Sequence, residues 1–589
     1  MKLSDYVVDF VQKEGVSHVF EFIGGAIVHL LDSISYRDDI ECVSVRHEQA
    51  AAFAAEAYAR LNGKLGVAMA TSGPGALNLL TGIGSCYFDS VPCLFITGQV
   101  NTYEYKFDRP IRQVGFQETD IVSVSKSLTK YAELVTDPKK IRYHLEKAIY
   151  LAQNGRPGPV LLDIPMNIQR ADIDPDNLES YFTSPEYFES RKEGNLDQDT
   201  LELVINMLGN AKRPLVLAGG GVRVGNASAE LELFLDKTGI PVVSSLMGLD
   251  VIPHTNPQNV GLIGSYGNRY SNLVLANCDL LLILGSRLDS RQTGTRPDTF
   301  ARGAKKIHVD MDVLELNSKV NVDVPIQSDL RGFLAAINQE ISSYYIKPDI
   351  CEWYSKISSL KEKYPTYSFQ PAADEIEPNR FMELLSSKCG HMAAVCLDVG
   401  QHQMWASQSY RLNNEQRMLN SGGMGAMGFA LPAAIGAALA SNKEVLVIAG
   451  DGGIQLNIQE FDTITRLNLP IKTVVMNNNS LGMVRQFQDL YMEGRQQSTV
   501  NKNPSFVKIA RAYGIPSFQM NSMNDIDKLE DFLSVDGPSF IEIKLEKKTE
   551  VHPKLVVNRP IEDMFPFLDR EELKEIMLID LAEEMEIPK

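Results

Sequence analysis

Two short polar clusters follow apolar runs in the last third of the chain. The triplet Gly450-Asp451-Gly452 ends the run EVLVIAG, and after 24 intervening residues Asn477 and Asn478 end the run KTVVM. Ligands of parallel α/β sheets bind beyond the carboxyl ends of the strands, so both clusters are expected to face one crevice. Either cluster alone is more often a turn than a site. Together, on successive strand ends, they predict a ligand site.

The predicted site has the chemistry of a metal ion and a diphosphate. The Asp451 carboxylate and the Asn478 amide oxygen are hard donors suited to Mg²⁺, which binds few protein groups and completes its octahedron with water and phosphate oxygens. Gly452 and Gly453 allow the backbone to approach a diphosphate, whose charge is favoured by the N-terminus of the following helix.

Three sets of short apolar runs must position these clusters. The first set is VSHVFEFIGG, KLGVAMATSGPG, VPCLFITGQ and GPVLLDIP; the second is RPLVLAGGG, IPVVSS, CDLLLILGS and KKIHVDMD; the third is HMAAVCLDVG, KEVLVIAGDGG, PIKTVVMNNNS and GPSFIEIKL. Runs of this kind, bounded by Gly or Pro and separated by helical patterns, are typical of buried parallel sheets. We therefore predict an α/β fold of three doubly wound parallel-sheet domains.

The length of 589 residues also requires several domains, because a single core stops growing near 250–300 residues. The runs place the domains at residues 1–170, 190–345 and 370–547, followed by an extension at 548–589. The acidic segment 171–199 is expected to be a linker between the first two domains.

The composition argues against some classes of binding partner and indicates the cellular compartment. The formal net charge of -18 argues against a nucleic-acid or anionic-membrane partner. The seven cysteines lack C-x-x-C spacing, which favours buried thiols in a reducing compartment. The N-terminus has no signal-peptide core, and no apolar run reaches 18 residues. We expect a cytoplasmic protein.

Further motifs connect the two clusters to a known family. GDG followed by NN resembles the signature of thiamine-diphosphate (ThDP) enzymes, and the rest of the chain resembles the acetolactate synthase (acetohydroxyacid synthase large, catalytic subunit) family. The motifs span nearly the whole chain in family order: GGA at 24–26, RHEQAAAFAAEAYAR at 46–60, TSGPGALNLLTG at 71–82, VPCLFITGQV at 91–100, GFQETD at 115–120, GRPGPVLLDIP at 155–165, GSRLDSRQTG at 285–294, SGGMGAMGFALPAAIGAALA at 421–440 and NNNSLGMVRQFQ at 477–488. The resemblance implies that the three domains are a ThDP pyrimidine-binding domain, a central FAD-binding-like domain and a ThDP diphosphate-binding domain.

By this resemblance Glu48 is the acid that contacts N1′ of the cofactor's aminopyrimidine. Glu48 follows the run ECVSV and opens an Ala-rich helix, where a carboxylate is otherwise explained by the helix dipole. A carboxyl group there can share a proton with N1′ and so turn the cofactor's own amino group into a base held close to the acid.

The resemblance also assigns the residues around the cofactor. Met427 is the apolar wedge beneath the bent cofactor, although a Met at such a helix start is otherwise core filler. Gly425 offers its backbone C=O to the 4′-amino group, and the backbone oxygen of Ser480 joins Asp451 and Asn478 as metal ligands. Gly450 and Met483 are expected to line the cofactor. In the family, Glu48 and the metal ligands come from different subunits, which implies a homodimer or homotetramer.

The remaining assignments concern the substrate and a flavin. Gly25, Phe116 and Gln117 match family positions around the reacting carbon. Arg291 matches the arginine at the family's substrate entrance. The alternative explanation of this arginine is a surface ion pair. In the central domain the candidate FAD-binding residues are Gly219, Gly220, Gly221, Arg287 and Asp310.

Four departures from the family border the acceptor side. Met166 replaces a lysine, Phe487 replaces the substrate-selecting tryptophan, and the usual G-Y-P-G-G loop reads EFIGG at 21–25. Residues 101–115 form a longer segment that carries Arg109 and Arg112 among aromatics. These side chains suit an acceptor with a phosphate and a planar base; a surface loop pinned by Pro110 explains them equally.

The resemblance implies a transferase that decarboxylates pyruvate and passes the two-carbon unit to a carbonyl acceptor, in the standard case a second 2-keto acid. One alternative keeps the chemistry but uses a nucleotide-linked keto sugar as acceptor. Another is a non-ligating 2-keto acid decarboxylase or pyruvate oxidase. An inactive scaffold is the non-enzyme alternative, although Glu48, Asp451 and Asn478 are all present.

Overall fold

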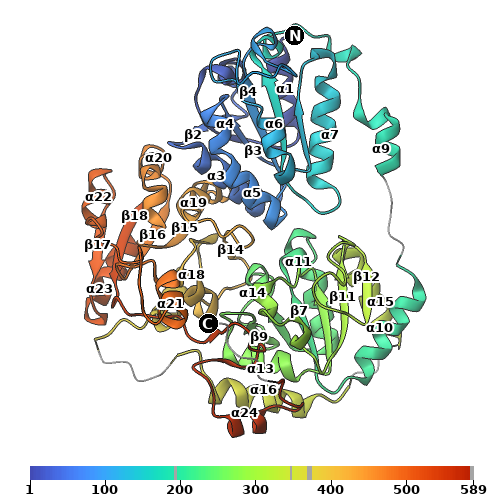
Figure 1. Cartoon of the computed structure of the whole chain (residues 1–589), viewed down its shortest axis with the longest axis vertical. Coiled ribbons are helices and arrows are strands. Elements are labelled where there is room, and N and C mark those ends of the chain that lie inside the picture. Colours follow the sequence, from blue (N-terminus) through green and yellow to red (C-terminus); the bar gives the residue numbers. More distant parts are fainter. Residues whose placement is uncertain (191–195, 345–347, 368–373, 584–589) are drawn as a thin grey trace.

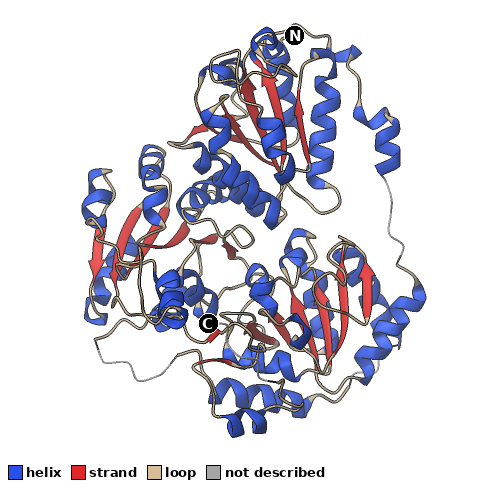
Figure 2. Ribbon diagram, viewed as in Figure 1, coloured by secondary structure: helices blue, strands red, loops and turns tan. Residues whose placement is uncertain are grey.

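Three six-stranded sheets, each with helices on both faces, make up the computed structural model (Figure 1). The structure describes residues 1–190, 196–344, 348–367 and 374–583. Every strand pair within the three sheets is parallel, and Figure 2 shows the sheets standing as separate layers among their helices. The predicted α/β fold of three doubly wound domains is confirmed. The exact domain boundaries stay predictions, and those at 345 and 370 lie outside the described residues.

The N-terminal sheet has the strand order β2 (Glu41–Ser44), β1 (His18–Phe22), β3 (Gly66–Ala70), β4 (Cys93–Gln99), β6 (Val160–Pro165) and β5 (Tyr131–Leu134). One face packs against α1 (Leu3–Lys13), α2 (Val28–Ser35) and α7 (Ile141–Gln153). The other face packs against α3 (Glu48–Asn62) and α5 (Leu80–Asp89). The central strands are buried on both faces, which explains their continuous apolar runs.

The central sheet has the order β12 (Val324–Gln327), β11 (Lys305–Asp310), β10 (Leu280–Leu284), β7 (Pro214–Ala218), β8 (Val242–Ser244) and β9 (Asn259–Leu262). Its first face is covered by α10 (Gln198–Asn210), α12 (Ser228–Thr238) and α15 (Leu330–Tyr344). Its second face is covered by α13 (Arg269–Asn277) and α16 (Cys351–Lys363).

The third sheet has the order β14 (Arg417–Leu419), β13 (Ala394–Leu397), β15 (Val445–Gly450), β16 (Ile471–Asn477), β18 (Ser539–Lys544) and β17 (Ser517–Met520). α19 (Ala430–Ser441), α20 (Phe461–Arg466) and α22 (Phe506–Ala512) pack on one face. α17 (Pro378–Cys389), α18 (Gln401–Ser409) and α23 (Ile526–Ser534) pack on the other.

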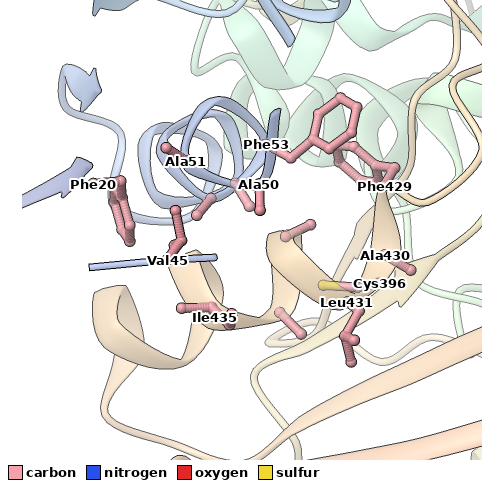
Figure 3. Close-up of a cluster of buried hydrophobic side chains, with 14 of the residues drawn as sticks. Phe20, Val45, Ala50, Ala51, Phe53, Cys396, Phe429, Ala430, Leu431 and Ile435 are labelled. Atoms are coloured by element: carbon pink, nitrogen blue, oxygen red, sulfur yellow. The ribbon is translucent and has the colours of Figure 1, made fainter. Parts of the chain in front are cut away.

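A single hydrophobic core joins the first and third domains through α3 and α19 (Figure 3). The facing surfaces of these two helices are largely alanine, so their backbones approach closely. At Gly436 a Cβ atom would overlap the carbonyl oxygen of Ala54, and only glycine fits there. Phe53 and Phe429 meet edge-to-face at 5.3 Å between ring centroids and seal one end of the contact.

The described part of the connection between the first two domains packs against α7. In the described part of the predicted linker, Tyr181 is buried against Tyr143 and Tyr150 of α7, with ring centroids 5.5 Å and 5.7 Å away. Residues 191–195 of the linker lie outside the described residues, and α10 of the central domain follows from Gln198.

The C-terminal extension returns across the molecule to the central domain. It contains the antiparallel pair β19 (Lys554–Leu555) and β20 (Met564–Phe565) and the short helix α24 (Arg570–Ile576). Its apolar side chains join the core beneath the central sheet: Ile561, Leu573, Ile576 and Met577. The extension therefore links the third domain to the second.

Candidate active site

The two polar clusters lie together at the carboxyl edge of the third sheet. β15 and β16 are neighbours, with Gly450 opposite Met476, so Asp451 and Asn478 follow adjacent strand ends. Their side chains are only 2% and 4% exposed. The Ser480 backbone N–H donates to Asp451 Oδ2 at 3.1 Å, which brings the third predicted metal ligand to the same place. The three residues predicted to hold the metal thus form one buried group.

A segment that the sequence did not single out covers Asp451. The Asn503 side-chain amide donates to Asp451 Oδ2 at 2.5 Å, and Asn501 lies 3.5 Å from the same oxygen. Burial raises the pKa of Asp451, and the hydrogen bonds from Asn503 and Asn501 oppose that rise. Hydrogen-bond donors at this carboxylate favour its charged form, the form that binds a cation.

The N-terminus of α18 supplies two more residues that the sequence reasoning missed. Gln401 Oε1 accepts a 2.8 Å hydrogen bond from the Asn478 amide. The buried His402 ring lies against Gly450, and its Nε2 has no hydrogen-bond partner within the described chain. Burial lowers the pKa of His402 to about 3, so the ring is neutral at physiological pH. The available signal was Gly400-Gln401-His402 just after the predicted strand HMAAVCLDVG, a third strand end at the same edge.

The turn that carries Gly425 and Met427 is held from two sides. Asp89 of α5 accepts hydrogen bonds from the backbone N–H groups of Gly422 and Gly423, at 2.8 Å and 2.7 Å. Gly428 donates its N–H to the buried Asp398, whose pKa is raised by burial to about 6. The turn therefore has a fixed conformation.

Within this turn, Gly425 adopts a φ of +66°, and a Cβ atom there would point into open space. The Met427 methyl group lies 3.3 Å from where a Gly452 Cβ would stand. Gly453, which follows the GDG triplet, lies against Asp398. Gly425 therefore borders open space, and Met427 lies next to the GDG turn; the cofactor roles of these two residues stay predictions.

Glu48 is the first residue of α3 and is 7% exposed. Its Oε2 accepts a 2.9 Å hydrogen bond from Asn78, and Oε1 lies beside Gly75. The neighbouring residue Gln49 accepts a hydrogen bond from Asn457 of the third domain. Among the described residues of one chain, no hydrogen bond or ion pair joins Glu48 to Asp451, Asn478 or Ser480. Within the described part of one chain, Glu48 is therefore not bonded directly to the residues predicted to hold the metal.

The three residues predicted around the reacting carbon lie at the carboxyl edge of the N-terminal sheet. Gly25 follows β1, and a Cβ atom on it would meet nothing within 4 Å. Phe116 is 85% exposed. Gln117 has a φ of +65°, a conformation that non-glycine residues rarely adopt and that marks a constrained position.

The long segment at 101–115 is organised by Glu118 rather than by Pro110 alone. The buried Glu118 carboxylate accepts backbone hydrogen bonds from Lys106 at 2.7 Å and from Val114 at 2.6 Å. Arg109 and Arg112 are both exposed, but Arg109 folds back and donates to the Lys106 and Tyr105 carbonyl oxygens. Part of the Arg109 guanidinium is therefore already engaged by its own loop.

The other predicted substrate residues lie on three different elements. Met166 begins the helix α8 (Met166–Gln169), whose Asn167 is hydrogen bonded to Thr102 at the start of the long segment. Phe487 lies on α21 (Gly482–Tyr491), as does the half-buried Met483. Arg291 on α14 (Ser290–Thr293) is exposed, and the described residues offer its guanidinium no ion pair. The surface ion pair that would have explained Arg291 plainly is not observed.

The predicted flavin residues surround the ends of three adjacent strands, β7, β10 and β11. A Cβ atom on Gly219 or Gly221 would overlap the backbone at Gly285, and one on Gly220 would press on Met247. Close packing alone thus explains these glycines. Asp310 ends β11, and burial raises its pKa to about 6. The Arg287 guanidinium reaches Gly423, in the turn that carries Gly425 and Met427.

Two further features concern the cysteines and the helices. All seven cysteines are free thiols, and five of them are buried. None of the described helices has the length and apolar character needed to cross a membrane.

Comparison with known proteins covers all three domains. Residues 1–124 match the model of the N-terminal TPP binding domain of thiamine pyrophosphate enzymes, residues 201–337 match the central domain, and residues 398–543 match the C-terminal TPP binding domain. The acetolactate synthase large subunit of Lactococcus lactis is 36% identical over 97% of this chain and 97% of its own length. The chloroplastic acetolactate synthase of Arabidopsis thaliana is 37% identical over 94% of this chain and 83% of its own. The Escherichia coli isozyme 2 large subunit is 36% identical over 94% and 97%. This chain belongs to the acetolactate synthase family of thiamine pyrophosphate enzymes.

Proposed function

We propose that this protein uses ThDP and Mg²⁺ to decarboxylate pyruvate and to transfer the remaining two-carbon unit to a carbonyl acceptor. The observation that carries the proposal is the buried group of Asp451, Asn478 and Ser480 at one sheet edge, directly before α21. The names of the relatives support the same reaction, with a second 2-keto acid as the leading acceptor.

The donor set fits Mg²⁺ with a diphosphate. One carboxylate, one amide oxygen and one backbone oxygen leave positive charge and open positions on the ion for phosphate oxygens. Asp451, Asn478 and the Ser480 carbonyl would hold the metal, and the unpartnered His402 Nε2 is available to the diphosphate. When bound, ThDP supplies an electron-accepting thiazolium ring that allows the keto acid to lose CO₂.

Glu48 would hold or release a proton at Oε1. Asn78 fixes the other carboxylate oxygen and so orients the group. Glu48 is buried beside Gly75, and this burial would strengthen a hydrogen bond from Glu48 to the pyrimidine ring when ThDP is bound. The fixed turn with Gly425 and Met427 would set the bend of the cofactor.

We further propose a homo-oligomer in which each active site combines Glu48 of one subunit with the metal group of another. Large apolar side chains are exposed near the carboxyl edges of both cofactor-binding domains: Ile23, Leu77 and Phe116 in the first, and Leu456, Val484 and Val500 in the third. Exposed apolar side chains gathered at a site favour an interface. A second copy would cover both groups and bring Glu48 to the metal group.

FAD is proposed at the ends of β7, β10 and β11, without a net redox role. Crevices at strand ends of parallel sheets are the usual place for a dinucleotide. Asp310 supplies a carboxyl group at these strand ends. Arg287 would offer a cation between the strand ends and the turn that carries Gly425 and Met427. The free thiols suit a cytoplasmic protein.

A nucleotide-linked keto sugar remains the second candidate acceptor. It is favoured by the organised segment at 101–115, which carries the exposed Arg112 and leads into the exposed Phe116. The folded position of Arg109 weighs against it, because that guanidinium is already hydrogen bonded to its own loop.

Product analysis tests the function. The protein is incubated with ThDP, Mg²⁺ and pyruvate, alone and with 2-ketobutyrate or a nucleoside-diphosphate-linked 4-keto sugar, and products are identified by mass. We expect CO₂ release that requires ThDP, together with acetolactate or an adduct of the added acceptor. Acetaldehyde or acetate as the main product would replace the transferase with a decarboxylase or an oxidase.

A further inference from the structure

Lys554, in the C-terminal extension, is a buried cation without a hydrogen-bond partner. Its side chain is 5% exposed, and its Nζ has no acceptor within the described chain. The Glu550 carboxylate acts on Lys554 through its charge, but it is paired with His552 at 3.0 Å. Burial accordingly lowers the pKa of Lys554.

Two aromatic rings of α21 face this ammonium group. Nζ lies 5.7 Å from the ring centroid of Phe487 and 5.8 Å from that of Tyr491, and the two rings are 4.6 Å apart. Ring faces attract a cation only weakly, whereas removal of a charged ammonium from water without an acceptor is costly. Among the described residues, the two rings therefore do not balance the cost of burying the Lys554 ammonium group.

The position of Lys554 relates it to the predicted substrate residues. Phe487 occupies the position to which the resemblance assigns substrate selection, and its ring, which is 45% exposed, lies over Nζ. The extension is held there by backbone hydrogen bonds: Leu555 N–H donates to Ser265, and Ser265 N–H donates to the Arg291 carbonyl, each at 2.7 Å. Val557 N–H donates to the Tyr491 hydroxyl at 2.9 Å. Two backbone hydrogen bonds through Ser265 thus connect the segment that carries Lys554 to the one that carries Arg291.

We propose that Lys554 binds an anionic group of the acceptor, which reaches Nζ when the Phe487 ring turns aside. The inference rests on the proposed transferase function and deepens it, because it states that the acceptor is an anion recognised by the C-terminal extension. A 2-keto acid carboxylate and the phosphate of a nucleotide-linked sugar share this chemistry. Arg291, which is exposed and without an ion pair among the described residues, would attract the same anion towards Lys554.

The test compares acceptors of different charge in holoenzymes that carry ThDP and Mg²⁺. Lys554→Met keeps the length of the side chain without its charge, and Lys554→Arg keeps the charge. The control is Lys574→Met, at an exposed position of α24. With saturating pyruvate as donor, the KM of the acceptor is measured for 2-ketobutyrate, for a nucleoside-diphosphate-linked 4-keto sugar and for neutral benzaldehyde.

We expect Lys554→Met to raise the KM of an anionic acceptor by at least about tenfold, because it removes a charge-assisted hydrogen bond, while the KM of benzaldehyde changes little. Lys554→Arg should restore most of the loss, and Lys574→Met should behave as the wild type. A loss confined to 2-ketobutyrate identifies a carboxylate as the ligand, and a loss confined to the sugar identifies a phosphate.

Three outcomes overturn the inference. The first is an equal effect on charged and neutral acceptors, which shows a structural role. The second is dissociation of the oligomer by Lys554→Met in sedimentation, which shows that a partner subunit supplies the anion. The third is unchanged use of every acceptor by a protein that still releases CO₂; in that case the proposed function stands. If the wild type itself releases no CO₂ from pyruvate, the proposed function fails and the inference fails with it.

Discussion

The side-chain amide of Asn503 donates a 2.5 Å hydrogen bond to the Oδ2 atom of Asp451. The same amide also lies within hydrogen-bond distance of Asn477 and Asn479, so one residue joins the ends of β15 and β16. Asn503 therefore holds the carboxylate in place before any cation arrives, and the proposed metal site is preorganised.

The first prediction tests that site. Asp451→Ala removes one of the two side-chain ligands and leaves the charge of the diphosphate less compensated. ThDP affinity should fall at least about tenfold and lose most of its dependence on Mg²⁺. Calorimetric titration of ThDP at several Mg²⁺ concentrations measures both effects. Asp527→Ala, on the exposed face of α23, is the control. Normal ThDP binding by the Asp451 variant would move the metal site elsewhere.

The second prediction concerns the proposed acid. Glu48→Gln keeps the size of the side chain and its hydrogen bond with Asn78, but removes the group that exchanges a proton. CO₂ release from pyruvate should drop by at least about 100-fold, the typical contribution of general acid–base catalysis, while ThDP still binds. Glu41→Gln on the exposed edge strand β2 serves as control. Near-normal turnover of the Glu48 variant would refute its assignment.

The third prediction concerns the flavin. Purified protein should carry FAD, visible by its absorbance, and the flavin should stay oxidised during turnover with pyruvate. Stoichiometric bleaching by pyruvate would instead identify an oxidase. If the protein is colourless and does not change on addition of FAD, the glycines at 219–221 serve only the close packing against Gly285.

The fourth prediction separates the two arginines of the long segment. Arg112 is exposed and free to contact an acceptor, so Arg112→Ala should weaken the use of a phosphate-bearing acceptor more than it slows CO₂ release. Arg109→Ala should instead loosen the loop, because its guanidinium holds two loop carbonyl groups. The double variant combines both effects, and Arg170→Ala on the same domain is the control. The measurement is the KM of each acceptor together with protease sensitivity of the segment. If the double variant makes acetolactate from pyruvate alone as fast as a highly active parent, the segment is a bystander surface.

The sequence predicted the central strands of all three sheets and missed most of the edges. Apolar runs mark β1, β3, β4 and β6 in the first sheet, and the corresponding four central strands in the other two. Among the six edge strands only β2 was noted, as the run before Glu48. β5 and β12 show why: they are half-buried and lack a continuous apolar run, because one side of an edge strand has no neighbour.

The site residues likewise include some that the sequence predicted and some that it missed. Asp451 and Asn478 were found because strand ends at a known spacing bring residues together, and adjacent pairing of β15 and β16 explains their proximity. Asn503 and Lys554 were missed because their loops return from far along the chain, and nothing in the local pattern of NKNP or VHPKL shows which strand end each loop will cover. Burial and the absence of an acceptor are properties of the folded chain alone.

The alanine-rich contact between α3 and α19 has a mechanical consequence. Where Gly436 meets Ala54 the backbones already touch, so neither helix can slide or rotate without a clash. Interlocked backbones of this kind resist shear far more than contacts between long side chains do. The first and third domains should therefore move as one rigid unit, and opening for substrate entry is left to the central domain, the C-terminal extension and the loop at 101–115. Hydrogen exchange along α3 and α19 should be among the slowest in the protein.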